Sequence, residues 1–283
     1  MTCSPGLAHR PRLAALALLS VLVGCGGTGD APVDLGPGPS DLPRDNVGPA
    51  VRYRITELHI PTLAEANADV PVGHNVDRVG DTCGVPDFDG GVDNSLIDLS
   101  AALADFAPPA EGLILQAAID AALHCAEDAE PTECTRLDLF VSVASGTGLT
   151  VVAIEDGAGT TLAGPFVGSL DGSGNLRAVT SQLDLTIPYH AASGPVDVRL
   201  DIVSMILTAN LSDSAMTNIV LGGALPSSAF EAMLMEVLPL LADEPTFEDV
   251  EPILANLYDV QLSGQCSALS VGFTGTATRV PTP

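Results

Sequence analysis

The feature that most constrains the fold is the alternation of apolar and polar residues that recurs from Leu137 to Leu211. The clearest example is the run VDVRLDI at 196–202, in which every second residue is apolar and the residues between are charged. This period of two is typical of a strand with one buried and one solvated face. Strands are therefore predicted over 51–60, 137–143, 149–154, 161–170, 176–187, 196–211, 218–221 and 266–280. Their close spacing and the Gly-rich turns between several of them favour antiparallel pairing.

Four segments have a helical pattern instead. Residues 95–106 and 110–126 are rich in Ala and Leu, and the second segment has a broad apolar stripe. Helices are also expected from 227 or 228 to about 241 and over 247–257, where Pro239 and Pro252 limit their length. No second linker is visible between Val51 and Pro283. We therefore expect one domain over 51–283 of the α+β class, an antiparallel β-sandwich-like fold with three to four packed helices.

The first residues have the three parts of an export signal: a basic region at 9–12, an apolar run over 13–23, and small residues before Cys25. The ending Leu22-Val23-Gly24-Cys25 resembles the lipobox of bacterial lipoproteins. This resemblance implies that residues 1–24 are cleaved, that Cys25 carries a lipid, and that the protein is anchored in the cell envelope. Two alternatives stay open, a secretory signal without a lipid and a transmembrane anchor, although the apolar run is short for a bilayer span.

Two features follow the proposed lipid site. Gly26 stands where an Asp would favour retention in the inner membrane, so the outer membrane is the expected location. Residues 25–50 are rich in Gly, Pro and Asp and contain almost no large apolar side chain. Such a segment cannot bury enough surface to offset its ordering entropy, so we expect a disordered tether that holds the domain away from the membrane.

The chain is strongly acidic. Its formal net charge is −26, it contains no lysine, and only eight arginines follow the signal against 36 acidic residues. Binding to nucleic acid or to anionic lipid headgroups depends on clustered basic residues, so neither is an expected partner. The expected partners are the membrane, through the lipid on Cys25, and an unidentified protein of the envelope. Solubility accounts for much of the acidity, but not for its concentration between residues 77 and 98.

Four cysteines remain once the signal is removed and Cys25 carries the lipid. An even number in an exported protein indicates two disulfides, for which three connectivities exist. We predict Cys125–Cys134, which would join a helix end to the strand after it, and Cys83–Cys266, which would tie the acidic segment to the last strand. The cysteine spacings match no zinc template.

The segment from Gly73 to Asp98 combines carboxylates and amides with glycines. Calcium takes six to eight oxygen ligands and its loops need glycine to turn sharply, so this composition predicts a Ca²⁺ site. The candidate ligands each carry a carboxylate or amide oxygen: Asp77, Asp81, Asp87, Asp89, Asp93, Asn94 and Asp98, joined by Asn75.

The spacing of Asp87, Asp89 and Asp98 resembles an EF-hand loop. However, Gly91 stands where an Asp or Asn belongs, and Val92 stands where the glycine belongs. We therefore predict a calcium loop of another kind. The alternative is a solvated loop without metal, held by Asx turns and a helix cap.

The sequence contains no nucleophile elbow, His-Glu-x-x-His motif, phosphate-binding loop or dinucleotide fingerprint. Beyond the signal, His59, His74, His124 and His190 each occur singly. These observations favour a non-enzymatic envelope or interaction module stabilised by disulfides and calcium. The alternative is a secreted hydrolase whose active-site residues meet only in space. A solute-binding lipoprotein is disfavoured because alternating βαβ units are missing from the predicted elements.

Four motifs make the mature domain similar to uncharacterised lipoproteins of high-GC Gram-negative bacteria. They are the opening strand Tyr53–Ile60, the Cys-Gly…Asp-x-Asp-Gly-Gly-Val-Asp-Asn segment before a helix, a mid-chain Leu-Gly-Gly, and the closing Gly-x-Cys-Ser…Ser-Val-Gly-Phe. The resemblance covers most of the mature chain. It implies export and lipid anchoring, and it implies no activity.

Overall fold

The computed structural model describes residues 47–68, 70–80, 82–89, 91–104, 115–130, 133–191, 194–240, 246–254 and 256–281. The chain divides into two compact units, Met1–Asp34 and Leu35–Pro283, and all the described residues belong to the second. The predicted signal peptide, the lipid site at Cys25 and most of the predicted tether therefore lie outside the described residues. Within the described part of the chain, every helix is too short or too polar to cross a membrane.

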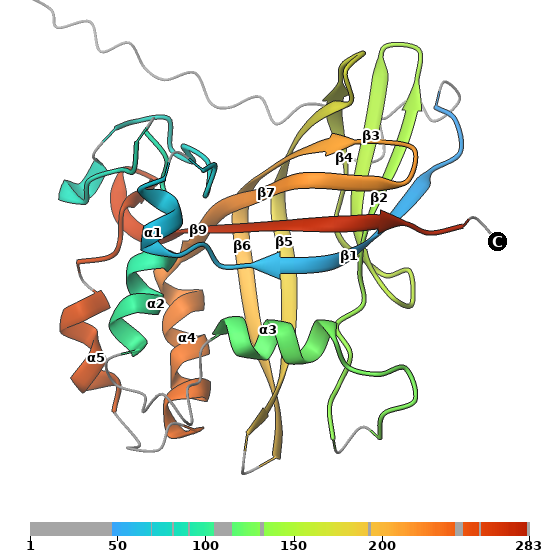
Figure 1. Cartoon of the computed structure of the whole chain (residues 1–283). Helices are drawn as coiled ribbons and strands as arrows, with labels where there is room; N and C mark the ends of the chain where they lie inside the picture. The colour runs from blue at the N-terminus through green and yellow to red at the C-terminus, as the bar shows by residue number, and fades with distance from the viewer. Residues whose placement is uncertain are drawn as a thin grey trace, which may run out of the picture. The chain divides into compact units, whose positions relative to one another are not determined.

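Nine antiparallel strands form one sheet (Figure 1). Each of the strands from β2 to β7 pairs with the one before it in the sequence, beginning with β1, and β9 then pairs with β7, β8 and β1. The strands are β1 (Val51–His59), β2 (Leu139–Gly146), β3 (Leu149–Asp156), β4 (Thr161–Leu170), β5 (Asn175–Ala191), β6 (Gly194–Leu211), β7 (Ala215–Pro226), β8 (Val260–Leu262) and β9 (Gln265–Arg279). Because β1 pairs with both β2 and β9, the sheet closes on itself.

Five α-helices are found among the described residues, and all are short. They are α1 (Leu63–Ala66), α2 (Leu96–Ala104), α3 (Leu115–Leu123), α4 (Ser227–Val237) and α5 (Phe247–Leu254). Helices α2, α4 and α5 gather at one end of the sheet, where they lie beside β9 and the lower ends of β5 and β6 (Figure 1). Their apolar residues join the same buried core as the strands.

The predicted α+β class is wrong. The described part of the chain is mostly antiparallel β, its helices are short, and the strands belong to one large sheet. Opposite parts of the closed sheet face each other across a shared core, where the sequence led us to expect two separate sheets. Alternation identifies strands because it reports one buried face, but the same alternation fits a closed sheet and a sandwich equally well.

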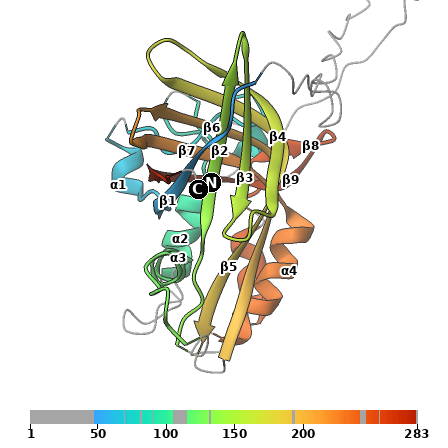
Figure 2. The same cartoon turned by 90° about the vertical axis from the view of Figure 1, so that its right-hand side faces the viewer.

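The long hairpin of β5 and β6 changes its buried face halfway along. On β5 the buried residues are Leu176 and Ala178 before Ser181 but Leu183 and Leu185 after it. The pattern on β6 shifts in the same way near Ser204, whose φ of 53° is left-handed. One half of the hairpin therefore closes the sheet, and the other half extends between α3 and α4 (Figure 2).

Two disulfides are present, with the pairings predicted from the sequence. Cys83–Cys266 joins the acidic segment to β9 across 183 residues, and Cys125–Cys134 closes the short segment after α3. The first bond joins the middle of the acidic segment to β9. It therefore holds this segment against the sheet.

Candidate functional site

The acidic segment is a ribbon that lies on the sheet. His74 and Asp93 form an antiparallel bridge in which the Asp93 N–H donates to the His74 carbonyl over 3.2 Å, and Phe88 bridges to Val92 in the same way. The described residues between His74 and Asp93 therefore belong to a loop whose two ends are held side by side. This arrangement brings residues separated by almost twenty positions close together.

A glycine of the sheet leaves room for the ribbon to pack closely against it. The amide of Asn94 donates to the carbonyls of Val72 (2.6 Å) and Gly272 (3.3 Å), and Nε2 of His74 lies 3.2 Å from the carbonyl of Val220. A Cβ atom on Gly272 would come within 2.5 Å of the Asn94 amide nitrogen and 2.6 Å of the Val72 carbonyl oxygen. Gly272 is therefore required for the close approach of the ribbon to β9.

Asp93 is the most constrained carboxylate of the ribbon. Its side chain is 1% exposed, and its Oδ2 accepts a hydrogen bond from the Val76 N–H over 2.7 Å. Its buried Oδ1 accepts no hydrogen bond from any described residue. Burial, together with the charges of Asp87, Asp77 and Asp259, raises the pKa of Asp93 to about 7, against the lowering effect of the Val76 hydrogen bond.

Two further oxygens near Asp93 are buried without a donor among the described residues. They are Oδ1 of Asn75 and Oδ2 of Asp77, whose other oxygen accepts from the Val79 N–H over 2.9 Å. The carboxylate of Asp87 lies on the same side, because a Cβ on Gly91 would meet both Asn75 and Asp87. Buried polar atoms are nearly always satisfied in folded proteins, so three unsatisfied oxygens around one loop need a physical explanation.

The structure brings together only part of the predicted ligand set. Asp77, Asp87 and Asp93 are near one another, whereas the side chain of Asp89 is exposed. Asp98 lies in the first turn of α2, and burial alone raises its pKa. Asn94 uses its amide to hold the ribbon on β9. Asp81 lies outside the described residues.

No three His, Cys, Asp or Glu side chains in the described ranges form a group that could hold a metal ion. A cation here would need the amide oxygen of Asn75, backbone carbonyls or water beside the carboxylates. Calcium accepts such mixed sets of oxygen ligands, whereas zinc sites are built from thiolates, imidazoles and carboxylates.

A second buried polar cluster lies beneath the ribbon and was not foreseen. Asp259 is 4% exposed, and its carboxylate accepts from the backbone N–H of Ser270 over 2.7 Å and from the Ser270 hydroxyl. The same hydroxyl oxygen accepts from the Ser95 N–H over 2.8 Å, so the cluster ties the start of α2 to β9. Asp259 stands alone before β8 in the sequence, with no motif to mark it.

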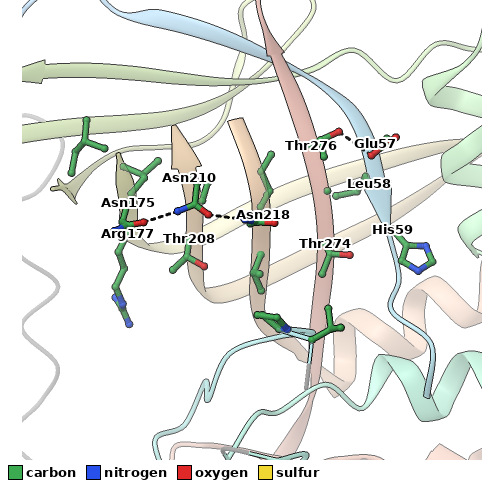
Figure 3. Close-up of a pocket in the computed structure, with 18 of the residues that line it drawn as sticks. Glu57, Leu58, His59, Asn175, Arg177, Thr208, Asn210, Asn218, Thr274 and Thr276 are labelled. Carbon is green, nitrogen blue, oxygen red and sulfur yellow. Dashed lines mark hydrogen bonds between the residues drawn. The ribbon is translucent and has the colours of Figure 1, made fainter. Parts of the chain in front are cut away.

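A polar groove, which the sequence did not predict, lies on the sheet beside α3 and residues 70–71. It has a volume of about 1330 Å³ and is lined by residues of β4, β5, β6, β7, β9 and β1. Ten of its lining residues are labelled in Figure 3. Cross-strand pairing places Arg177, Thr208, Val220, Thr274 and His59 in one row along its floor. We call this site the polar groove.

A second row of polar side chains runs beside the first. The amide of Asn218 donates to Asn210 (2.8 Å), and the amide of Asn210 donates to Asn175 (2.5 Å). Further along, the hydroxyl of Thr276 donates to the carboxylate of Glu57 over 3.0 Å. The floor of the groove therefore presents amides on β5, β6 and β7 and hydroxyls on β6 and β9, whose side chains are drawn in Figure 3.

The four histidines of the described chain have separate partners. Nε2 of His59 lies 2.9 Å from the Glu65 carboxylate, and Nε2 of His190 lies 3.1 Å from the Thr135 hydroxyl. Nδ1 of His124, directly after α3, lies 2.8 Å from the Asp120 carbonyl oxygen. Burial lowers the pKa of His74, and the charge of Arg177 adds to this effect. In the described part of the chain no histidine is hydrogen-bonded to a serine, so the geometry does not point to an acyl-transfer triad.

Comparisons of the chain with protein family models, with curated proteins and with solved structures give no match.

Proposed function

We propose that this protein is an exported lipoprotein of the cell envelope that acts as a calcium-stabilised interaction module. The sequence supports export through the signal-like residues 1–24, and anchoring through a lipid on Cys25 in the outer membrane. Two disulfides fit an oxidising compartment. The residues after Cys25 provide the length needed to hold a folded domain away from the membrane surface.

The observation that carries the calcium proposal is the set of buried oxygens at the acidic ribbon. Oδ1 of Asn75, Oδ2 of Asp77 and Oδ1 of Asp93 have no donor among the described residues, and Asp87 adds its charge beside them. In the absence of a cation, such an arrangement combines desolvation with repulsion between like charges. A Ca²⁺ ion bound to Asn75, Asp77, Asp87 and Asp93, with carbonyls or water completing its shell, would reverse both effects.

Calcium in this role is structural. The ribbon is fixed at its ends by the His74–Asp93 bridge and at its centre by the Cys83–Cys266 disulfide. An ion that binds only the folded ribbon stabilises the whole domain by mass action. Val70 and Pro71, which directly precede the ribbon in the sequence, line the polar groove, whereas no residue of the ribbon itself is among the described lining residues.

Thermal unfolding of the full-length protein in millimolar CaCl₂ and in EDTA tests this proposal. We expect calcium to raise the midpoint by several degrees, and Asp77→Asn to remove most of that increase. Asp89→Asn is the matched control, because Asp89 lies in the same ribbon but its side chain is exposed. Equal midpoints in the two solutions, or equal effects of the two substitutions, would contradict the assignment.

A further inference from the structure

Arg177 is an exposed cation in a protein where cations are scarce. Five other arginines of the described chain bind an acidic side chain or a carbonyl: Arg52, Arg54, Arg136, Arg199 and Arg279. The side chain of Arg177 forms no ion pair or hydrogen bond with any described residue, a property it shares with the side chain of Arg78. Unlike Arg78, it lines the polar groove, and it lies close enough to His74 to affect the pKa of that imidazole.

The opposite end of the groove is acidic. Glu57 on β1 and Asp120 on α3 both line it, and both side chains are exposed. Glu57 accepts a hydrogen bond from Thr276, and Asp120 accepts one from the amide of Gln116 over 2.7 Å. Neither donor is a cation, so neither carboxylate forms an ion pair through these hydrogen bonds. Arg177 is the one arginine among the described lining residues, on the same side as Asp171, and Glu57 and Asp120 place two carboxylates at the far end.

Amides and hydroxyls cover the floor between the two ends. Thr208 and Thr274 each present a hydroxyl, and the ladder of Asn175, Asn210 and Asn218 presents amide groups. Such groups both donate and accept hydrogen bonds, as the N–H and C=O groups of a peptide require. No Phe, Tyr or Trp is found among the described lining residues, so a sugar would lack the large aromatic rings on which sugars usually stack.

We propose that the polar groove binds an extended peptide whose C-terminal carboxylate lies on Arg177 and Thr208 and whose amino terminus lies beside Glu57 and Asp120. A guanidinium can hold a carboxylate through two parallel hydrogen bonds, which gives this end its specificity. The hydroxyl of Thr208 lies in the adjacent position on β6, directly across from Arg177.

The dimensions of the groove set the length of the ligand. Arg177 and His59 are separated by four strand-to-strand steps, because Thr208, Val220 and Thr274 lie between them. Steps of about 4.8 Å give roughly 19 Å, which an extended chain rising about 3.3 Å per residue covers with about six residues. The ligand is therefore a hexapeptide or the last six residues of a longer chain.

A synthetic pool of random hexapeptides with free termini tests the proposal against full-length protein in CaCl₂. Bound peptides are separated by gel filtration and counted by mass spectrometry. We expect at least tenfold enrichment over an otherwise identical pool with amidated C termini. Peptides selected in this way should bind Arg177→Gln at least tenfold more weakly and Arg177→Lys with intermediate affinity. A pool with acetylated N termini should also be enriched less than the pool with free amino termini. The Glu57→Gln variant should enrich these two pools equally.

Arg199→Gln is the matched control, because Arg199 is an exposed arginine of β6 that pairs with Asp201 and does not line the groove. Lack of enrichment, equal enrichment of the acid and amide pools, or unchanged binding by Arg177→Gln would overturn the proposal. The peptide proposal does not require calcium to bind. A calcium titration of Arg177→Gln, expected to match that of the unsubstituted protein, separates a failure here from a failure at the acidic ribbon.

Discussion

The side-chain amide of Asn94 donates a hydrogen bond to the backbone carbonyl of Gly272, 178 residues further along the chain. The same amide group donates to Val72, so one side chain joins both the start of the acidic ribbon and the last long strand. The position of the candidate calcium ligands is therefore fixed by the sheet, because Asp93 is the neighbour of Asn94 in sequence.

Gly272→Ala should displace the ribbon. Its Cβ would meet Asn94 and Val72 at distances no real Cβ adopts, so we expect a loss of about 1–3 kcal/mol in the free energy of unfolding. Gly172→Ala is the control, since a Cβ there meets nothing within 4 Å. Urea unfolding of both variants measures the difference. A Gly272→Ala protein as stable as the control would show that the ribbon does not depend on this contact.

The two disulfides should contribute unequally. Their cysteines are separated by 183 and 9 residues, and a larger closed loop removes more entropy from the unfolded chain. The chain-entropy relation gives about 5 kcal/mol for Cys83–Cys266 and about 3 kcal/mol for Cys125–Cys134. Paired Cys→Ala variants, compared by urea unfolding under oxidising conditions, measure both values. We also expect removal of Cys83–Cys266, but not of Cys125–Cys134, to reduce the stabilisation by calcium. A larger loss of stability on removing Cys125–Cys134, or a calcium effect that depends on that bond instead, would contradict this prediction.

Asp93→Asn should stabilise the protein in the absence of calcium. The raised pKa of Asp93, about 7, means that the folded state keeps a proton that the unfolded chain releases above about pH 4. Its contribution to the free energy of unfolding therefore falls as pH rises from about 4 to 7, by at most about 4 kcal/mol. In EDTA we expect Asp93→Asn to exceed the unsubstituted protein in stability at pH 8 and to match it near pH 4.5.

Comparing the two proteins at each pH removes the effects of other titrating groups. The lowered pKa of His74 acts in the opposite direction, because its contribution to stability is lost as pH falls below about 6.5. The lowered pKa of Glu65, about 2, affects stability only below about pH 4.5. Both groups are present in Asp93→Asn and in the unsubstituted protein. A variant less stable than the unsubstituted protein at pH 8 would contradict the placement of Asp93 among unsatisfied oxygens.

Local signals in the sequence predicted most strands and both disulfide pairings, but not the closed sheet. The alternating residues of β6 indicate that one face of the strand is buried, but they do not indicate which strands pair with it. Closure depends on β1 pairing with β9, residues more than 200 positions apart, and no residue pattern records that pairing. The length of β7 was also underestimated, because its glycines Gly222 and Gly223 suggested a turn where they instead allow close packing.

The four residues of the candidate site, Asn75, Asp77, Asp87 and Asp93, were all among the ligands named from the sequence, but the sequence could not separate them from the other acidic residues of the segment. Spacing suggested Asp87, Asp89 and Asp98 as a set, yet the bridge between His74 and Asp93 instead places Asn75 and Asp77 beside Asp93. The polar groove could not be predicted at all. Its residues come from six strands and one helix as well as from loops, and only the register of the sheet places the strand residues together.

Isothermal titration of CaCl₂ into the EDTA-treated, dialysed full-length protein at pH 8 tests the central claim most directly. The account predicts saturable binding of one calcium ion per chain in the submillimolar to millimolar range, weakened at least tenfold by Asp93→Asn and unchanged by Asp89→Asn. Titrations that show no saturable binding, or that show equal binding by Asp93→Asn, would contradict it.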